Sequence, residues 1–178
     1  MRTLRAGIFV LISIVLAIFL VVVAIGAFLP KQHVATSAAR FHQSPNAIWE
    51  AITDSSRFPE WRKDVARVEP LPEVNDKPSW REFDIHGNAI PYQVMVMVPP
   101  RALVVRIADA KLPFGGTWTY EISPMTDGTS LLRITEDGEV YNPVYRFASR
   151  FVLGYSSTQE QFLRTLGAKF GQNVTIEK

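Results

Sequence analysis

The sequence predicts an α+β protein in which a curved antiparallel sheet surrounds a long C-terminal helix, preceded by one N-terminal transmembrane helix. Three features predict this class: a long uncharged run at the N-terminus, six short β-type runs separated by turn residues, and an amphipathic stretch after the last run. We divide the chain into an anchor at residues 1–30, a connector at 31–35 and one domain at 36–178.

The apolar run extends from Ala6 to Leu29, contains no charge and has Ser13 as its one polar side chain. A helix that rises about 1.5 Å per residue over this run is long enough to cross a hydrocarbon core of about 30 Å. A cleavable signal peptide is the alternative, but its apolar region is usually only about 7–15 residues long. We therefore expect a membrane anchor.

Basic residues on either side of the anchor predict its orientation. Arg2 and Arg5 precede it at the short leading end, whereas Lys31 and Arg40 follow it. The end with more positive charge stays in the cytoplasm. We expect a single-pass protein of the cell membrane with a cytoplasmic N-terminus and an extracytoplasmic domain.

The composition excludes several kinds of site. The chain has no cysteine, which excludes disulfides, thiolate metal ligands and a cysteine nucleophile. Of its 19 basic residues, Arg2 and Arg5 precede the domain, so the remaining 17 balance the 17 acidic residues. A neutral domain without a concentrated basic face predicts no nucleic-acid partner.

The domain opens with a strand and two helical signals. Residues 36–43 predict the strand, and Ser44-Pro45 predicts an N-cap with proline at the first helical position, for a helix that ends near Asp54. Phe58-Pro59-Glu60-Trp61 predicts a second short helix or turn.

Six β-type runs follow, and the short links between them favour an antiparallel meander. Alternation in the fifth run places Trp118, Tyr120 and Ile122 on one face, which we expect to be the buried one. The six predicted strands are residues 65–71, 80–86, 89–98, 102–109, 116–123 and 130–140.

A second cap-and-proline signal, Asn142-Pro143, opens the last element. Apolar residues then recur every three or four positions as far as about Phe170, which predicts the longest helix of the domain. Gly154 interrupts this helix, and we expect a bend or a close backbone approach there.

Two stretches resemble the START-like (SRPBCC) superfamily and its polyketide cyclase and dehydratase branch. Residues 41–54 resemble the family's first strand, Ser-Pro turn and tryptophan-bearing helix, and Arg57-Phe58-Pro59-Glu60-Trp61 resembles its next turn. The resemblance covers about residues 36–170 and implies a helix-grip fold with an apolar cavity between the sheet and the last helix. It also implies lipids, sterols or polyketides as ligands, with catalysis in only some branches.

Candidate ligand-binding residues are the side chains that we expect to face this cavity. Tyrosine and tryptophan combine apolar surface with one hydrogen-bonding group that can orient a ligand. For each residue the alternative is ordinary core packing. Met95 and Met97 are further candidates, although parity leaves open which face of their strand points inward. The candidates are Trp61, Phe83, Tyr92, Trp118, Tyr120, Leu132, Ile134, Tyr145, Phe151, Tyr155 and Phe162.

Glu136 is a weak catalytic candidate. It shares strand parity with Leu132 and Ile134, and a desolvated carboxyl there would have a raised pKa suited to general acid or base work. The alternative, which we favour, is that the strand ends or bulges near Asp137-Gly138 and leaves Glu136 solvated.

The three histidines lack the spacing of a metal site. His33 lies in the expected connector, and His42 and His86 lie in separate expected strands. We expect no metal and no cofactor.

These observations predict membrane-anchored binding of a hydrophobic or amphipathic small molecule, lipid-like or polyketide-like, in an internal cavity. One alternative is an enzyme of cyclase, dehydratase or hydrolase type acting on such a ligand, and another is an interaction protein with a filled core. The lack of an evident cluster of acid, base and nucleophile favours binding over catalysis. No protein partner is predicted.

Overall fold

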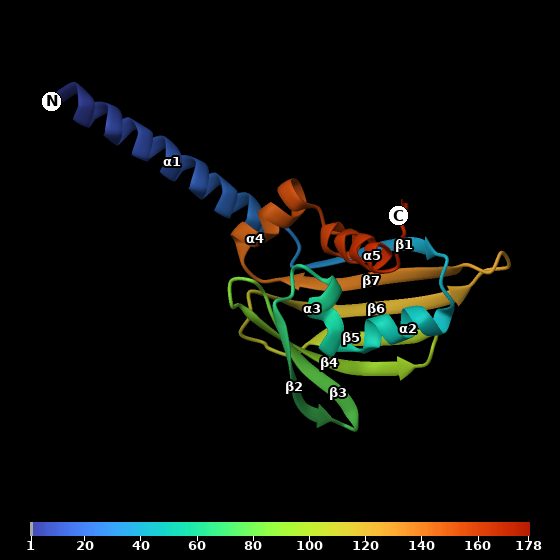
Figure 1. Cartoon of the computed structure of the whole chain (residues 1–178). Helices are drawn as coiled ribbons and strands as arrows, with labels where there is room; N and C mark the ends of the chain where they lie inside the picture. Colours follow the sequence, from blue (N-terminus) through green and yellow to red (C-terminus); the bar gives the residue numbers. More distant parts are fainter. Residues whose placement is uncertain (1) are drawn as a thin grey trace.

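The computed structural model describes residues 2–178 and contains one curved, eight-stranded antiparallel sheet (Figure 1). The strand order is β2-β3-β4-β5-β6-β7-β1-β8, so the predicted meander is confirmed and the first strand closes against the last long one. The strands are β1 (Gln32–Phe41), β2 (Arg67–Val74), β3 (Lys77–Phe83), β4 (Ala89–Val98), β5 (Ala102–Ile107), β6 (Phe114–Pro124), β7 (Ser130–Val140) and β8 (Ile176–Glu177).

Helices lie at the start of the chain and along one face of the sheet (Figure 1). Together with the sheet they form the helix-grip arrangement that the sequence predicts. The helices are α1 (Arg2–Phe28), α2 (Pro45–Thr53), η1 (Ser55–Arg57), α3 (Phe58–Trp61), α4 (Pro143–Ala148), the π-helical turn η2 (Ser149–Leu153) and α5 (Ser157–Lys169).

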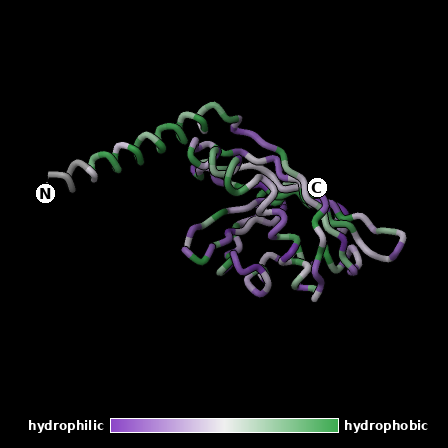
Figure 2. Tube along the Cα trace, turned by 90° about the horizontal axis from the view of Figure 1, so that it is seen from above, coloured by the Kyte–Doolittle hydropathy of each residue, from purple (hydrophilic) through white to green (hydrophobic). Residues whose placement is uncertain are grey.

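Helix α1 projects away from the domain, and Figure 2 shows it as largely hydrophobic along its length. Its segment Gly7–Phe28 is the one helix in the described part of the chain that is long and apolar enough to cross a membrane. A signal sequence near an N-terminus has the same length and composition, so these properties alone fit both a span and a leader.

Both predicted helix caps are present. The Ser44 hydroxyl accepts a hydrogen bond from the Ala47 amide at 3.3 Å, and the Asn142 side-chain oxygen accepts one from the Val144 amide at 2.8 Å. In each case proline follows the cap at the first helical position, where its missing N–H leaves no hydrogen bond unmade.

The first strand differs from the prediction at its start. β1 begins at Gln32 rather than at residue 36, so most of the expected connector at 31–35 is strand. The reason is its partner: β1 pairs with β7 in unbroken register from Gln32 opposite Glu139 to Phe41 opposite Ser130. Local sequence patterns do not reveal where pairing with a distant strand begins.

The predicted C-terminal helix is present, but it is divided into three pieces rather than continuous from Pro143 to Phe170. α4 ends at Ala148, η2 follows, and Gly154 then has φ +80° and breaks the helical path before α5 begins at Ser157. A positive φ is accessible to glycine at little cost, so the residue expected to bend the helix ends it instead.

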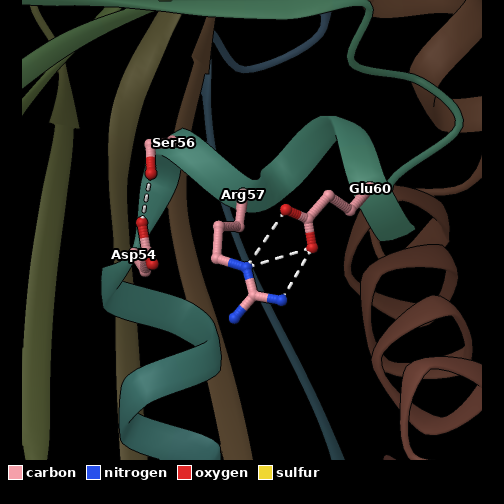
Figure 3. A network of polar contacts seen from close by, with 4 residues as sticks. All are labelled: Asp54, Ser56, Arg57 and Glu60. Atoms are coloured by element: carbon pink, nitrogen blue, oxygen red, sulfur yellow. Dashed lines mark hydrogen bonds and ion pairs between the residues drawn. The ribbon is translucent and has the colours of Figure 1, made fainter.

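The short link between α2 and α3 is held by local polar contacts (Figure 3). The Ser56 hydroxyl donates a hydrogen bond to Asp54 at 2.5 Å. The Arg57 guanidinium donates two hydrogen bonds to the Glu60 carboxylate, from Nε at 3.0 Å and from Nη2 at 2.8 Å. This contact lowers the pKa of Glu60. The link turns the chain so that Phe58 points into the core.

The core lies between the concave face of the sheet and the helices α2, α3 and α5. Phe41 of β1 and Leu103 of β5 are buried there with Leu163 and Leu166 of α5. These contacts hold α5 against β1 and α3 (Figure 1).

Candidate ligand cavity

A cavity of about 690 Å³ lies between the concave face of the sheet, the segment α4–η2 and the first turns of α5. Sites for small molecules typically measure about 300–1,000 Å³ and combine apolar walls with a few polar groups. This cavity has that composition. Its walls combine aliphatic side chains such as Leu103 and Ile107 with aromatic side chains, and two separate clusters of polar side chains also line it.

Six of the eleven predicted ligand residues line this cavity. Trp118 and Tyr120 point inward from β6, as their parity predicts, and their rings lie 6.0 Å apart. Phe162 of α5 meets both rings, at 6.2 and 5.5 Å between centroids. The full set of predicted residues that line the cavity is Tyr92, Trp118, Tyr120, Tyr145, Tyr155 and Phe162.

The other five predicted residues lie elsewhere. Leu132 and Ile134 are fully buried in the solid part of the core, and Trp61 borders a separate groove beside Lys169. Phe83 points to the other face of the sheet, where the Arg67 guanidinium lies over its ring. Phe151, expected to face inward, is 59% exposed because it belongs to η2 rather than to a continuous helix.

The two methionines that parity left open are exposed. Met95 and Met97 lie near the end of β4, where the register with β5 shifts between Val94 and Val96. Before this irregularity, Ile90, Tyr92 and Val94 are the inward-facing residues of β4.

The first polar cluster surrounds Glu136, which lines the cavity from β7. Its side chain is 18% exposed, so the solvated alternative that we favoured is wrong. β7 continues without a break to Val140, which keeps Glu136 on the inward face. Burial raises the pKa of Glu136, and hydrogen bonds from Gln159 (3.3 Å) and Trp118 oppose that rise.

His33 completes this cluster, and the sequence interpretation missed it. Its Nε2 lies 3.8 Å from a Glu136 oxygen, and its ring stacks on Tyr155 with centroids 4.1 Å apart. The ring lies over Gly138, where a Cβ would come within 2.5 Å of it. Burial lowers the pKa of His33, with the charge of Asp137 opposing, so the imidazole is neutral at neutral pH.

The alternation of buried residues in β1 could have predicted that His33 faces inward. Ser37, Ala39 and Phe41 are buried on one face, and extending the strand upstream by twos puts Ala35 and His33 on the same face. The assumption that residues 31–35 form a connector concealed this.

The second polar cluster is an ion pair between Arg62, which follows α3, and Glu82 of β3. Their charged groups are 3.0 Å apart and almost buried, with Asp64 at 2.7 Å on the other side of the guanidinium. Trp80 donates to Glu82 at 3.0 Å. Burial opposes the charge on Arg62, but the two carboxylates outweigh it and raise the pKa of Arg62.

Burial also raises the pKa of Glu82, although Arg62 and the Trp80 hydrogen bond limit that rise. Tyr92 and Tyr120 stand beside this cluster inside the cavity, and burial raises the pKa of both phenols. Both hydroxyls therefore remain protonated and can donate a hydrogen bond to a bound molecule at any physiological pH.

The two clusters occupy different parts of the cavity. β3 and β7 are four strand positions apart in the sheet, roughly 19 Å along its surface at a usual spacing of about 4.8 Å. The aromatic side chains of β4, β6 and α5 lie between them. The interior is therefore apolar in the middle and polar at two sides, which suits an elongated amphipathic molecule.

Within the part of the chain that the structure describes, no three histidine or carboxylate side chains gather in a way that could hold a metal ion. His42 lies just beyond β1, and His86 lies in the turn between β3 and β4, so neither joins His33.

The model of the family described as polyketide cyclase / dehydrase and lipid transport matches residues 32–171. The chain belongs to this family. The match begins at the first residue of β1 and ends just after α5, so the polyketide cyclase / dehydrase family domain contains the whole cavity. A search of curated proteins finds no match.

Solved structures of other proteins share the family fold. A START superfamily protein from Mycobacterium smegmatis is similar with TM-score 0.62 and 19% identity, over 77% of this chain and 96% of that one. Zhui aromatase/cyclase from Streptomyces sp. R1128 has TM-score 0.61 and 13% identity, over 79% and 92%. Norcoclaurine synthase from Thalictrum flavum has TM-score 0.61 and 8% identity, over 80% and 88%. At such identities the likeness concerns the fold.

Proposed function

We propose that this protein binds a hydrophobic or amphipathic small molecule, lipid-like or polyketide-like, in its internal cavity while α1 anchors it in the cell membrane. The observation that supports binding most strongly is the cavity itself, with its apolar centre and its buried polar groups at two sides. Membership of a family that includes lipid transport proteins points to the same class of ligand.

The proposed ligand contacts follow from the side chains that line the cavity. Trp118 and Phe162 would pack against the apolar part of the molecule. Tyr92 or Tyr120 would donate a hydrogen bond to a polar group at one side, and His33 with Glu136 would meet a second polar group at the other. The positions of these hydrogen-bonding groups would determine which ligand the cavity selects.

The proposed anchor is the uncharged helix α1, with its N-terminus in the cytoplasm and the domain outside. The arginines at positions 2 and 5 favour this orientation, since the more positive end remains in the cytoplasm. A mature chain beginning near Gly26 would instead show a cleaved signal peptide and would overturn the anchor.

Filling the cavity tests the binding proposal. Ile107 lines the cavity from β5 and is half-buried, so Ile107→Trp places an indole in the open space. We expect the full-length protein in detergent to bind the amphipathic fluorophore 1-anilinonaphthalene-8-sulfonate, and Ile107→Trp to weaken that binding by about tenfold, the equivalent of about 1.4 kcal/mol.

The matched control is Arg106→Trp, one residue away on the outer face of β5, where the side chain is exposed. It adds the same group outside the cavity and should leave fluorophore binding within about twofold of the parent, as surface substitutions usually do. Equal binding by both variants would mean that the fluorophore does not enter the cavity and would contradict the proposal.

A second candidate function is catalysis on the same ligand, favoured by the contact between His33 and Glu136. A neutral imidazole can accept a proton, and a carboxyl with a raised pKa can donate one, within one cavity. Such a pair suits the cyclase, dehydratase or hydrolase chemistry in which a proton is moved on a bound, mostly apolar molecule. The structure also provides an open cavity, which argues against a filled-core interaction protein.

Glu136→Gln tests the state of this carboxyl. Because burial raises the folded-state pKa of Glu136, its favourable contribution to stability is fully present below the unfolded-state pKa and is lost as pH rises through the folded-state pKa. Glutamine has no charge to desolvate. We therefore expect urea unfolding of the solubilised chain to show little difference at pH 4 and a more stable variant at pH 8.

The same variant separates the two functions, because it keeps the shape of the side chain while removing ionisation. A pure carrier should retain fluorophore binding in Glu136→Gln, and an enzyme should lose turnover while binding persists. A variant less stable than the parent at pH 8 would show that Glu136 is solvated or ion-paired, contrary to the geometry described here.

A further inference from the structure

The tip formed by Arg150, Phe151, Val152 and Leu153 is the most exposed apolar segment of the domain. Phe151 is 59% exposed, Val152 72% and Leu153 64%, and all three are consecutive. They belong to η2, a π-helical turn, and such irregular turns are concentrated at functional sites. A contiguous exposed apolar patch of this kind is typical of a surface that contacts a protein or a membrane.

The position of this tip is fixed by contact between α4 and the last turns of α1. Arg146 donates to the Leu29 carbonyl at 2.7 Å and approaches the Ala27 carbonyl, which satisfies acceptors left free at the end of α1. At Gly26 the helices touch so closely that a Cβ would lie 1.9 Å from the Pro143 carbonyl oxygen. α4 therefore lies beside the segment of α1 that would leave the bilayer.

Figure 1 shows the consequence of this contact for η2. α4 and η2 rise from the sheet on the side from which α1 departs, whereas the turn between β6 and β7 lies at the opposite end of the domain. If α1 spans a membrane, the tip is on the membrane side and Thr126 in that turn is on the far side.

The charge pattern of the segment also suits a lipid surface. Residues 140–159 include no aspartate or glutamate, and Arg150 is exposed beside the apolar residues of the tip, whereas Arg146 is buried against the end of α1. An apolar tip that carries an exposed arginine and no acidic residue is typical of segments that lie in the headgroup region, where anionic lipids attract arginine.

The segment is also one wall of the cavity. Tyr145, Ala148, Ser149 and Leu153 line the cavity on its inner side, while Phe151 and Val152 point to solvent. Leu153 is shared, because it both lines the cavity and is exposed. The apolar tip therefore lies at the edge of the cavity.

We propose that the η2 tip inserts into the lipid headgroup region beside α1, so that the mouth of the cavity opens on the bilayer surface and the ligand passes between bilayer and cavity without crossing bulk water. This inference rests on the proposed anchoring by α1. The membrane thus covers the apolar side chains of the tip, and the anchor α1 holds the tip at the membrane surface.

The absence of cysteine makes a direct test possible, since one introduced cysteine is the only thiol. Full-length Val152→Cys and Thr126→Cys proteins are labelled with nitrobenzoxadiazole and reconstituted in vesicles of phosphatidylcholine and phosphatidylglycerol. Some vesicles contain lipid with a nitroxide near the headgroup. We expect the nitroxide to quench the label at position 152 at least about twofold more than the label at 126, because only the tip reaches that depth.

Flotation of the vesicles distinguishes failure of the membrane anchor from failure of the tip to insert. Protein that does not float with vesicles would overturn the anchor and this inference together. Protein that floats, with equal quenching at both positions, would overturn the inference alone. A label at 152 that is shielded from water but unquenched would mean that a second copy or another protein covers the tip, which also overturns it.

A variant checks that the apolar side chains hold the tip in place. Phe151→Ser with Leu153→Ser, in the labelled Val152→Cys chain, removes apolar surface from exposed positions and should not affect the core. Quenching at 152 should fall to the level at 126 while flotation is retained. Unchanged quenching would show that these side chains do not insert and would contradict the proposal.

Discussion

Arg62→Ala is expected to destabilise the domain by about 3–5 kcal/mol, the usual cost of removing one partner of a buried ion pair. Glu82, 8% exposed at its side chain and 3.0 Å from Arg62, would remain as an uncompensated charge. Asp64 would lose its contact with the guanidinium as well. Urea unfolding of the solubilised full chain, followed by tryptophan fluorescence, measures the change.

The control combines Arg62→Leu with Glu82→Gln. This pair removes both charges, keeps the volume of each side chain similar and leaves an oxygen that can still accept the Trp80 hydrogen bond. Most of the lost stability should return, because replacing a buried pair by neutral groups is often close to neutral. A loss under about 1 kcal/mol for Arg62→Ala would instead mean that the pair is solvated and behaves as a surface contact.

Phe162→Ala is expected to cost about 3–5 kcal/mol, as for other large aromatic residues truncated in a core. The side chain is 6% exposed and packs against Trp61, Trp118 and Tyr120. Its removal would also enlarge the cavity, because it forms part of the wall. Chemical unfolding gives the loss of stability.

Phe151→Ala is the matched control for this truncation. The same side chain is removed from the same C-terminal segment, but from an exposed position on η2, so the change in unfolding free energy should stay within about 0.5 kcal/mol. Equal losses at positions 151 and 162 would contradict the assignment of the segment to a broken helix with an exposed tip.

Local signals in the sequence predicted the elements well where the cause is local. Ser44 and Asn142 cap their helices as their proline neighbours predict, and Trp118 and Tyr120 face inward as alternation predicts. In these cases the physical cause involves only a few consecutive residues. The same applies to the meander, whose strands are joined by short turns.

The predictions failed where the cause was a distant partner. β1 extends to Gln32 because β7 pairs with it, more than a hundred residues later in the chain. The inward face of β3 was assigned to Phe83, whereas Glu82 occupies it because Arg62 compensates its charge. Hydrophobic alternation assigns a carboxylate to the solvent-exposed face unless the positive charge that compensates it is known.

The break in the C-terminal helix explains the remaining differences at the site. Apolar periodicity continues through Phe151, so no local pattern excludes this residue from the buried face. The chain changes direction at Gly154 and the helix ends there, which leaves the apolar residues Phe151, Val152 and Leu153 exposed. The same break brings two tyrosines to the cavity from different segments: Tyr145 from α4, and Tyr155 from the turn that precedes α5.

Central to the proposed function is that the cavity holds an apolar or amphipathic molecule obtained from the membrane. Native mass spectrometry of the full-length protein, purified from its own membranes in mild detergent, tests this claim most directly. We expect a complex with one small molecule that is extracted by organic solvent, and no such complex from Ile107→Trp, in which the added indole occupies the cavity. Parent protein free of any bound molecule, or an equal amount bound to Ile107→Trp, would contradict the account.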